Sequence, residues 1–318
     1  MPANAACFSR PSGVPSHDRL LSESGPHLSP TPAPHPCASG LCAPLFPRNK
    51  MMNSPDVDFT CTECAKCCHD LRLPLTVGEA INWLSRGASV EILCEAMPWL
   101  DEPSPDNAWA AHKRRRSFAA TCGELPIRVT VILAAAFAGP CPNLLPNKRC
   151  GIYDERPLVC RIYPAEINPF IALDPRHKAC PPDAWTPGLP ALVRAGRLVD
   201  ARTIEAIERS RRADADELAL KARLCRALGI DRAAISNEGF VVHSPARGVL
   251  LDALSAARAD TSAGSVSIEA NAAGSEWTLL SDRRTSVDAL AAVGAHGEFA
   301  DGRPNAAFSY LSRAGPAA

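Results

Sequence analysis

The 318-residue sequence shows no excess of charge of either sign and no long hydrophobic segment. It has 34 basic and 34 acidic residues, so its net charge does not indicate nucleic acid or an anionic membrane as a partner. The longest apolar run, residues 129–138, is interrupted by Thr130 and is too short to cross a bilayer. We therefore expect neither a nucleic-acid-binding protein nor a membrane protein.

The signatures of several enzyme classes are also missing. The chain contains no P-loop, no serine-hydrolase elbow and no paired-carboxylate motif. No two glycines lie two positions apart, so the glycine-rich loop of the common methyltransferases is absent. The start of the chain lacks the basic residues and apolar core of a signal peptide. We therefore expect a cytoplasmic protein whose thiols stay reduced.

Cysteine, in contrast, is abundant and clustered, with 14 residues in all. This density lies below the roughly 8–10% that is typical of disulfide scaffolds. Four cysteines fall within Cys61–Cys68, where two successive C-x2-C steps let a tight turn aim sulfurs at a common point. In a reducing compartment such a cluster indicates metal ligands rather than disulfides or unliganded thiols.

The adjacent Cys67 and Cys68 are unusual in a ligand cluster. Neighbouring side chains of an extended chain point to opposite faces. The two cysteines therefore either bind different metal centres, or one of them binds a metal and the other only supports the site. A simple ferredoxin loop would place its fourth ligand at position 71, which is Leu71. The fourth ligand must come from far along the chain, and metal binding would then tie residues 61–68 to residues 141–180 and help to hold the fold.

A second group of cysteines supplies the missing ligands. Together the two groups give two sets of four thiolates, namely Cys61, Cys64, Cys67, Cys68, Cys141, Cys150, Cys160 and Cys180. The stretch from Cys150 to Pro164 reads C-x-I-Y-x-x-R-P-x-x-C-R-x-Y-P. With the first cluster, this stretch resembles the YkgJ-type cysteine-cluster (CxxCxxCC) family of bacterial proteins, over about residues 59–182.

The resemblance implies a zinc- or iron-chelating domain that uses these eight cysteines. We therefore expect a metal-binding protein that holds an iron–sulfur cluster or Zn²⁺, and we favour the cluster. The alternative is an enzyme, because some members of the family are labelled Fe–S oxidoreductase or flagellin lysine N-methylase. The sequence assigns no catalytic residue.

Charged and aromatic residues lie between the cysteines. Basic side chains that would offset the negative charge of a thiolate site are Lys66, Lys148, Arg149, Arg156 and Arg161. Arg156 and Arg161 flank Cys160, whereas the others are equally typical of a solvated surface. Tyr153 and Tyr163 either shield the sulfurs from water or pack in an ordinary core.

Several further residues have a functional and a structural interpretation. His69 and His177 lie near cysteines and are able to replace a thiolate at a zinc site, although a surface histidine is the more common case. Cys122 is a candidate ninth ligand. The basic run 112–116 would suit a phosphate or an acidic partner, but such a run is more often a charged face. Cysteines expected to be structural or incidental are Cys7, Cys37, Cys42, Cys94 and Cys225.

The fold class expected is α+β: a small, irregular, metal-stapled domain with flanking helices and a few short strands. Thr76 and Glu79 form a capping box at the start of a helix. The patterns predict a second short helix over Val90–Met97, a strand over Ile127–Leu133 and a helix over Asp200–Leu228. Short strands are expected at 240–242 and 277–280.

Four regions are expected along the chain. Residues 1–50 are a proline-rich, disordered extension, which is outside the mature protein if translation starts at Met51. The others are a cysteine-cluster metal-binding domain at 51–185, a mostly helical region at 186–260 and a variable C-terminal region at 261–318.

Overall fold

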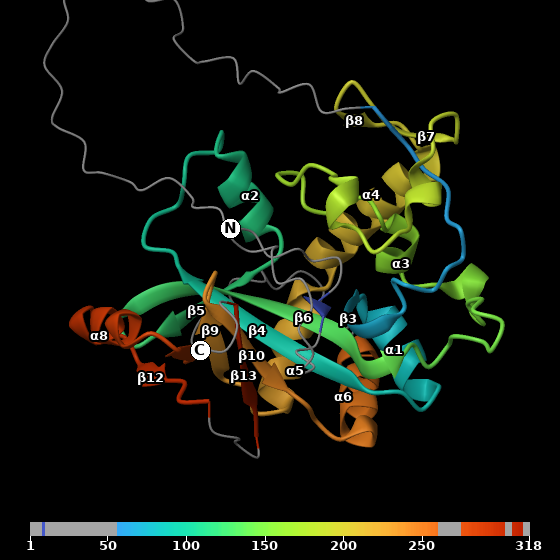
Figure 1. Cartoon of the computed structure of the whole chain (residues 1–318). Helices are drawn as coiled ribbons and strands as arrows, with labels where there is room; N and C mark the ends of the chain where they lie inside the picture. The colour runs from blue at the N-terminus through green and yellow to red at the C-terminus, as the bar shows by residue number, and fades with distance from the viewer. Residues whose placement is uncertain (1–7, 10–55, 260–274, 303–306, 314–318) are drawn as a thin grey trace, which may run out of the picture.

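The computed structural model describes residues 8–9, 56–259, 275–302 and 307–313 (Figure 1). The rest of the expected extension, with Cys7, Cys37 and Cys42, lies outside the described residues. The strands are β1 (Phe8–Ser9), β2 (Val57–Asp58), β3 (His69–Leu75), β4 (Val90–Pro98), β5 (Phe118–Cys122), β6 (Leu125–Pro140), β7 (Ala191–Arg194), β8 (Arg197–Leu198), β9 (Arg232–Ile235), β10 (Gly239–His243), β11 (Thr278–Ser281), β12 (Gly297–Phe299) and β13 (Ser309–Ser312).

Helices and strands are mixed along the chain, as the expected α+β class requires. The helices are α1 (Val77–Ser85), α2 (Ala108–Arg114), α3 (Leu158–Ile162), α4 (Ala201–Asp216), α5 (Leu218–Ala227), α6 (Arg247–Ala259) and α8 (Arg284–Ala292), and single 3-10 turns occupy Tyr153–Glu155, Pro175–His177 and Pro182–Trp185.

The main sheet has ten strands, and β6, with 16 residues, runs through its centre. Strand β6 pairs antiparallel with β3, β4 and β5. From β4 the sheet continues through the parallel strands β9, β11 and β12, while β10 pairs with both β4 and β13. Strands from the first and the last third of the chain therefore share one sheet.

Helices α1, α5 and α6 cover one face of this sheet (Figure 1). Trp83 of α1, Leu224 of α5 and Leu250 of α6 pack with Leu133 of β6 in one apolar core. We call the ten-stranded sheet with these three helices the sheet body. Its core consists of apolar side chains removed from water, which is the main source of folding free energy in a globular domain.

The capping box predicted at the start of α1 is confirmed. The Thr76 hydroxyl accepts a hydrogen bond from the Glu79 amide, and the Glu79 carboxylate accepts one from the Thr76 amide. The predicted strand over 127–133 lies within β6, and those at 240–242 and 277–280 coincide with β10 and most of β11.

The helix predicted over Val90–Met97 is wrong, because these residues form β4. The strand is buried along nearly its whole length. Ile92 and Cys94 face the main core, whereas Leu93 faces a smaller apolar cluster on the other side of the sheet. A strand that is covered on both faces loses the polar–apolar alternation by which strands are recognised. The expected packing role of Cys94, which is fully buried, is confirmed.

The helix predicted over 200–228 forms as two helices. Asp200 caps the first through its carboxylate, and Gly229, with a φ of 64°, follows the second. The break falls at Glu217, which ends α4. The Glu217 carboxylate accepts a hydrogen bond of 2.8 Å from the Val77 amide, and so caps α1 from a distance of 140 residues in the sequence.

Most of the cysteine-rich sequence lies outside the sheet body. We call residues 56–68 and 141–200 the cysteine lobe. It contains a small sheet in the order β2-β7-β8, the short helix α3 and the three 3-10 turns. Val57, Leu192 and Val193 form its own small apolar cluster.

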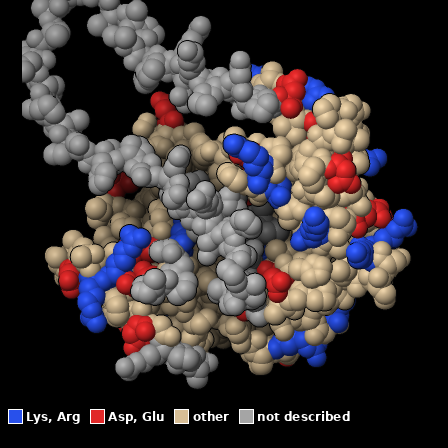
Figure 2. Space-filling view, viewed as in Figure 1, with Lys and Arg blue, Asp and Glu red and all other residues tan. Residues whose placement is uncertain are grey.

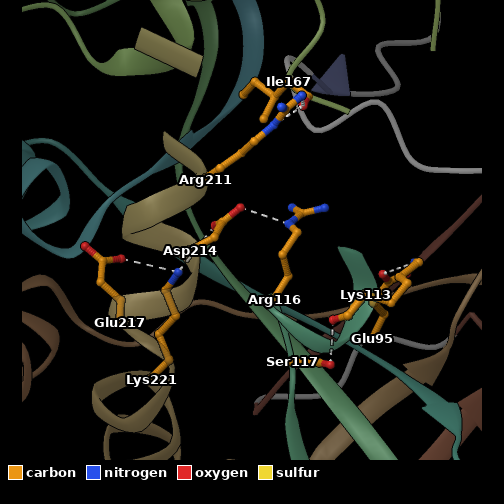
Figure 3. Close-up of polar contacts among 9 residues, drawn as sticks. All are labelled: Glu95, Lys113, Arg116, Ser117, Ile167, Arg211, Asp214, Glu217 and Lys221. Atoms are coloured by element: carbon orange, nitrogen blue, oxygen red, sulfur yellow. Dashed lines mark hydrogen bonds and ion pairs between the residues drawn. The ribbon is translucent and has the colours of Figure 1, made fainter. Parts of the chain in front are cut away.

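A polar network links the segment that follows α2 with α4 and α5 (Figure 3). Arg116 donates to the Asp214 carboxylate at 2.9 Å, and Lys221 lies 4.0 Å from the same carboxylate group. The buried Lys113 pairs with Glu95 of β4 at 3.5 Å. Within the basic run, Lys113 and Arg116 are therefore engaged with acidic groups of this chain.

The visible face carries acidic and basic side chains scattered among uncharged residues (Figure 2). This distribution agrees with the zero net charge of the sequence. Across the ranges that the structure describes, the helices do not combine the length and the apolar character needed to cross a membrane.

Candidate metal centre

The register of β3 against β6 brings the first two groups of cysteines together. His69 at the start of β3 lies opposite Pro140 at the end of β6. One residue further, the Cys141 amide donates a hydrogen bond of 2.7 Å to the Cys68 carbonyl. The Gly139 amide donates to the Asp70 carboxylate at 2.6 Å, which fixes the same end of the ladder. The sheet body thus sets the position of Cys68 beside Cys141.

The first cluster occupies a tight turn, as its spacing predicts. Glu63 and Ala65 adopt left-handed backbone conformations, with φ of 52° and 60°. The Cys68 amide bonds to the Ala65 carbonyl at 2.9 Å, and a His69 ring nitrogen lies 3.1 Å from that same oxygen. His69 is therefore occupied by the backbone of the turn.

A short loop returns the chain from Cys141 to Cys150. The Leu145 amide bonds to the Arg149 carbonyl and the Gly151 amide to the Asn143 carbonyl, each at 2.8 Å. Leu144 and Cys150 form an isolated β-bridge. These contacts hold Cys150 close to the start of the loop.

Helix α3 carries Cys160, and Glu79 holds the start of this helix. Pro157 precedes α3, and the Cys160 amide bonds to the Pro157 carbonyl at 3.0 Å, one turn later, as predicted. The Leu158 amide donates to the Glu79 carboxylate at 2.7 Å, while the other oxygen of Glu79 caps α1. One carboxylate thus serves the first turns of two helices. The local sequence pattern predicts the role of Glu79 at α1 alone, since the contact with α3 spans 79 residues.

Cys180 reaches the site through a loop that runs beside the first cluster. The Ala179 amide donates to the Tyr163 hydroxyl at 2.7 Å. The Thr60 amide bonds to the Ala184 carbonyl at 3.0 Å, so the residue before Cys61 lies along the turn that follows Cys180. Lys178 and Glu166 form a buried ion pair in the same loop.

All eight predicted cysteines line one cavity of about 610 Å³. They are Cys61, Cys64, Cys67, Cys68, Cys141, Cys150, Cys160 and Cys180. The remaining cysteines within the described ranges, Cys94, Cys122 and Cys225, are buried elsewhere. Four separate segments of the chain therefore deliver thiols to the same space.

These cysteines line the cavity without forming a compact set of ligands. Within the described residues, no three Cys, His, Asp or Glu side chains are placed closely enough to hold a metal ion. Cys67 and Cys68, the adjacent pair, have their sulfurs 3.9 Å apart. A set of eight soft sulfur donors around one cavity fits a thiolate-bound metal or cluster by its chemistry.

The pKa values of three cavity thiols are raised above the ordinary value of a cysteine. A hydrogen bond with Cys67, together with burial, raises the pKa of the Cys68 thiol, and the nearby Arg156 opposes this effect. Burial raises the pKa of Cys141 and of Cys180. A thiolate is the form that binds metal, so metal binding at these cysteines would release protons.

Four basic residues line the cavity: Lys148, Arg149, Arg156 and Arg161. Arg149 pairs with Glu63 at 3.0 Å. Arg156 lies over the Tyr153 ring, 3.8 Å from its centroid, and Arg161 donates to the Arg156 carbonyl at 2.8 Å. Both predicted tyrosines, Tyr153 and Tyr163, line the cavity, whereas Lys66 lies outside its wall.

The other candidate ligands from the sequence have different partners among the described residues. His177 lies 3.7 Å from Asp174, outside the cavity wall. Cys122 is buried in the sheet body, with its sulfur 3.3 Å from the His296 carbonyl. Neither is therefore placed to join the eight cysteines.

Residues 60–181 match the CxxCxxCC family model, which is described as "Putative zinc- or iron-chelating domain". The resemblance seen in the sequence is thus confirmed over this range, which contains all eight cysteines of the cavity. No curated protein and no solved structure matches the chain.

Proposed function

We propose that the cysteine lobe binds metal through its eight clustered cysteines, and that it holds iron–sulfur clusters rather than zinc. One observation carries this proposal. The eight cysteines of the family pattern come from four segments and all line one cavity, whereas Cys94, Cys122 and Cys225 do not. Folding alone has no need to gather eight thiols, since free cysteine acts in a core as a small hydrophobe.

The size of the cavity favours a cluster over single zinc ions. A structural zinc site is a closed tetrahedron with Zn–S bonds of about 2.3 Å, which leaves no room between its sulfurs. The cysteines here line a cavity of about 610 Å³, together with apolar and basic residues. An iron–sulfur cluster contains several iron and sulfide ions and so needs a wider ring of cysteines. When bound, such a cluster supplies one-electron transfer.

The surroundings of the cavity suit a charged inorganic group. Leu71, Leu73 and Phe137 of the sheet body, together with Trp83, form an apolar wall that limits access of water. Basic side chains line other parts of the wall and offset the charge of thiolate ligands. Burial and local charge are two of the means by which a protein sets the reduction potential of a cluster.

The test is protein purified without oxygen, with an absorption spectrum and with iron, zinc and sulfide analysis. We expect a brown protein that contains iron and acid-labile sulfide. Colourless protein that contains zinc without iron would overturn the assignment of a cluster. Protein that binds neither iron nor zinc after attempted reconstitution would overturn the metal-binding function itself.

A further inference from the structure

We infer that the indole N–H of Trp83 donates a hydrogen bond to the metal centre in the cavity and thereby raises the reduction potential of that centre. This inference rests on the proposed function, because the acceptor is a sulfur of the bound cluster or of its thiolate ligands. Trp83 belongs to the sheet body, so a side chain of the body acts on the chemistry of the cysteine lobe.

Trp83 is a buried side chain with an unused hydrogen-bond donor. The residue is 4% exposed, and its Nε1 has no hydrogen-bond partner among the described residues. A buried N–H without a partner costs free energy, and a buried tryptophan therefore usually finds one. Trp83 is also one of the residues that line the cavity of the eight cysteines. The group bound in this cavity is thus the candidate acceptor.

Helix α1 places Trp83 beside the helix that carries Cys160. Glu79 lies one helical turn before Trp83, so the two side chains share a face of α1. The Glu79 carboxylate accepts a hydrogen bond of 2.7 Å from the Leu158 amide, and Leu158 is the first residue of α3. The face of α1 that carries Trp83 is therefore turned toward α3.

The ring of Trp83 also lies against the end of the β3–β6 ladder. It stacks on Phe137, with ring centroids 6.4 Å apart and an interplanar angle of 24°. Phe137 lies opposite Leu71 in the register of the two strands. Cys141 comes shortly after Phe137 in β6, and Cys68 comes shortly before Leu71 in β3. Trp83 therefore borders the part of the cavity where the sheet body positions Cys68 and Cys141.

The chemistry of a cluster explains what a donor does at this place. The neighbouring residues of the wall, Leu71, Leu73 and Phe137, have no side-chain donor. Reduction adds negative charge to a cluster, and a hydrogen bond to a sulfur strengthens as the charge of the acceptor grows. The N–H of Trp83 therefore stabilises the reduced state more than the oxidised state.

Two replacements of Trp83 separate its donor from its packing. Trp83→Phe removes the N–H together with part of the ring, whereas benzothienylalanine at position 83 keeps the shape of the indole and has sulfur in place of the N–H. Both proteins should bind as much iron and sulfide as the wild type. At a fixed solution potential, the ratio of reduced to oxidised cluster should fall by about 2- to 10-fold in both, as expected for the loss of one hydrogen bond.

Trp277→Phe is the matched control. Trp277 is 2% exposed in the core of the sheet body and lies outside the cavity wall. Its replacement should leave the ratio of reduced to oxidised cluster at the wild-type value. An equal fall in Trp277→Phe would overturn the inference, because a general loss of core packing would then explain the effect.

The outcomes separate this inference from the proposed function. A wild-type ratio in the protein with benzothienylalanine, at full iron and sulfide content, would overturn the inference and leave the proposed function intact. Wild-type protein that holds no iron after reconstitution would instead remove the proposed cluster.

A measurement on the wild-type protein avoids any folding defect of the variants. With isotope-labelled tryptophan, each indole N–H gives its own NMR signal. Unpaired electrons of a cluster should shift or broaden the signal of Trp83 in the iron-loaded protein, and removal of iron should reverse this effect. The signal of Trp277 should be the same in both forms. A Trp83 signal that does not respond to iron would show that its N–H does not meet the centre, and would overturn the inference.

Discussion

The sheet body and the cysteine lobe are built by different physical means. In the sheet body, side chains such as Ile92, Leu133 and Leu279 are fully buried in an apolar core. In the lobe, the apolar cluster is small, and Cys61 is exposed while the other seven cavity cysteines are only partly buried. Burial therefore stabilises the body. If the cysteines bind metal as proposed, the lobe is expected to depend on the bound metal instead.

Removal of metal is expected to have the largest effect and to act on the lobe. Chelation under reducing conditions should open the loops around Cys150 and Cys180 to protease, because their ordering depends on bonds to metal. The strands β4 and β6 should stay protected. Limited proteolysis followed by mass spectrometry, or hydrogen exchange, measures both regions in one sample. Equal loss of protection in β6 and in the lobe would show that the two regions are not independent.

A core substitution should show the opposite pattern. Leu133→Ala removes a fully buried side chain of β6 and should lower the free energy of unfolding by about 2–5 kcal/mol. The metal content of the folded fraction should stay at the wild-type level. Urea unfolding and metal analysis measure the two quantities. The matched control is Leu100→Ala, since Leu100 is 70% exposed and its loss should change stability by less than about 0.5 kcal/mol.

Glu79 lies between the two regions, so its loss should affect both by a smaller amount. Glu79→Ala leaves the first turns of α1 and α3 without their carboxylate cap and should cost about 1–2 kcal/mol. Helix α3, which carries Cys160, should also become less well ordered, so metal should dissociate faster in the presence of a chelator. Glu205→Ala, on the exposed side of α4, is the control. A variant that is destabilised but keeps the wild-type rate of metal loss would show that Glu79 stabilises the sheet body and not the cysteine lobe.

The smallest expected effect concerns pH and lies away from the cysteines. Burial, followed by the charges of Arg116, Arg211 and Lys113, lowers the pKa of His112 to about 4, while Asp214 opposes them. The unfolded chain, with an ordinary pKa of about 6.5, then binds more protons between these values. The contribution of His112 to stability is therefore present above about pH 6.5 and is lost as the pH falls towards 4.

Unfolding at pH 7 and at pH 5 tests this behaviour. His112→Gln should weaken the loss of stability between the two pH values. An identical pH dependence in the wild type and in His112→Gln would show that His112 does not contribute to it. Any effect of acid on the proposed metal ligands is the same in the wild type and in the variant, so it cancels when their changes in stability are compared.

Local patterns in the sequence were sufficient where the structure is locally determined. The capping box of Thr76 and Glu79, the turn of the first cluster and the placement of Cys160 one turn after Pro157 all depend on neighbours within a few residues. The family pattern also selected the eight cysteines that line the cavity and left out Cys94. Their role as ligands stays a prediction.

Features set by distant contacts could not be read in the same way. Val90–Met97 has the spacing of a helix but forms a strand of the main sheet, where burial on both faces hides the period of a strand. Glu217 interrupts the predicted helix at a residue whose carboxylate caps α1. Neither the burial of Val90–Met97 nor the contact of Glu217 with α1 is indicated by neighbouring residues in the sequence. The same holds for the link between Glu79 and α3.

The register of β3 against β6 also fixes an order of events. Residues 69–140 lie between Cys68 and Cys141, and their pairing must close before these two cysteines become neighbours. During synthesis the first cluster emerges early, but its proposed partner Cys180 follows 112 residues after Cys68 (180 minus 68). A nascent chain therefore presents four reactive thiols without their partners for as long as the ribosome takes to make this segment, several seconds at about 5–20 residues per second. If the cysteines bind metal as proposed, premature capture of metal by the first cluster alone is a hazard of this chain order. Rapid closure of the β3–β6 ladder would shorten the period of exposure.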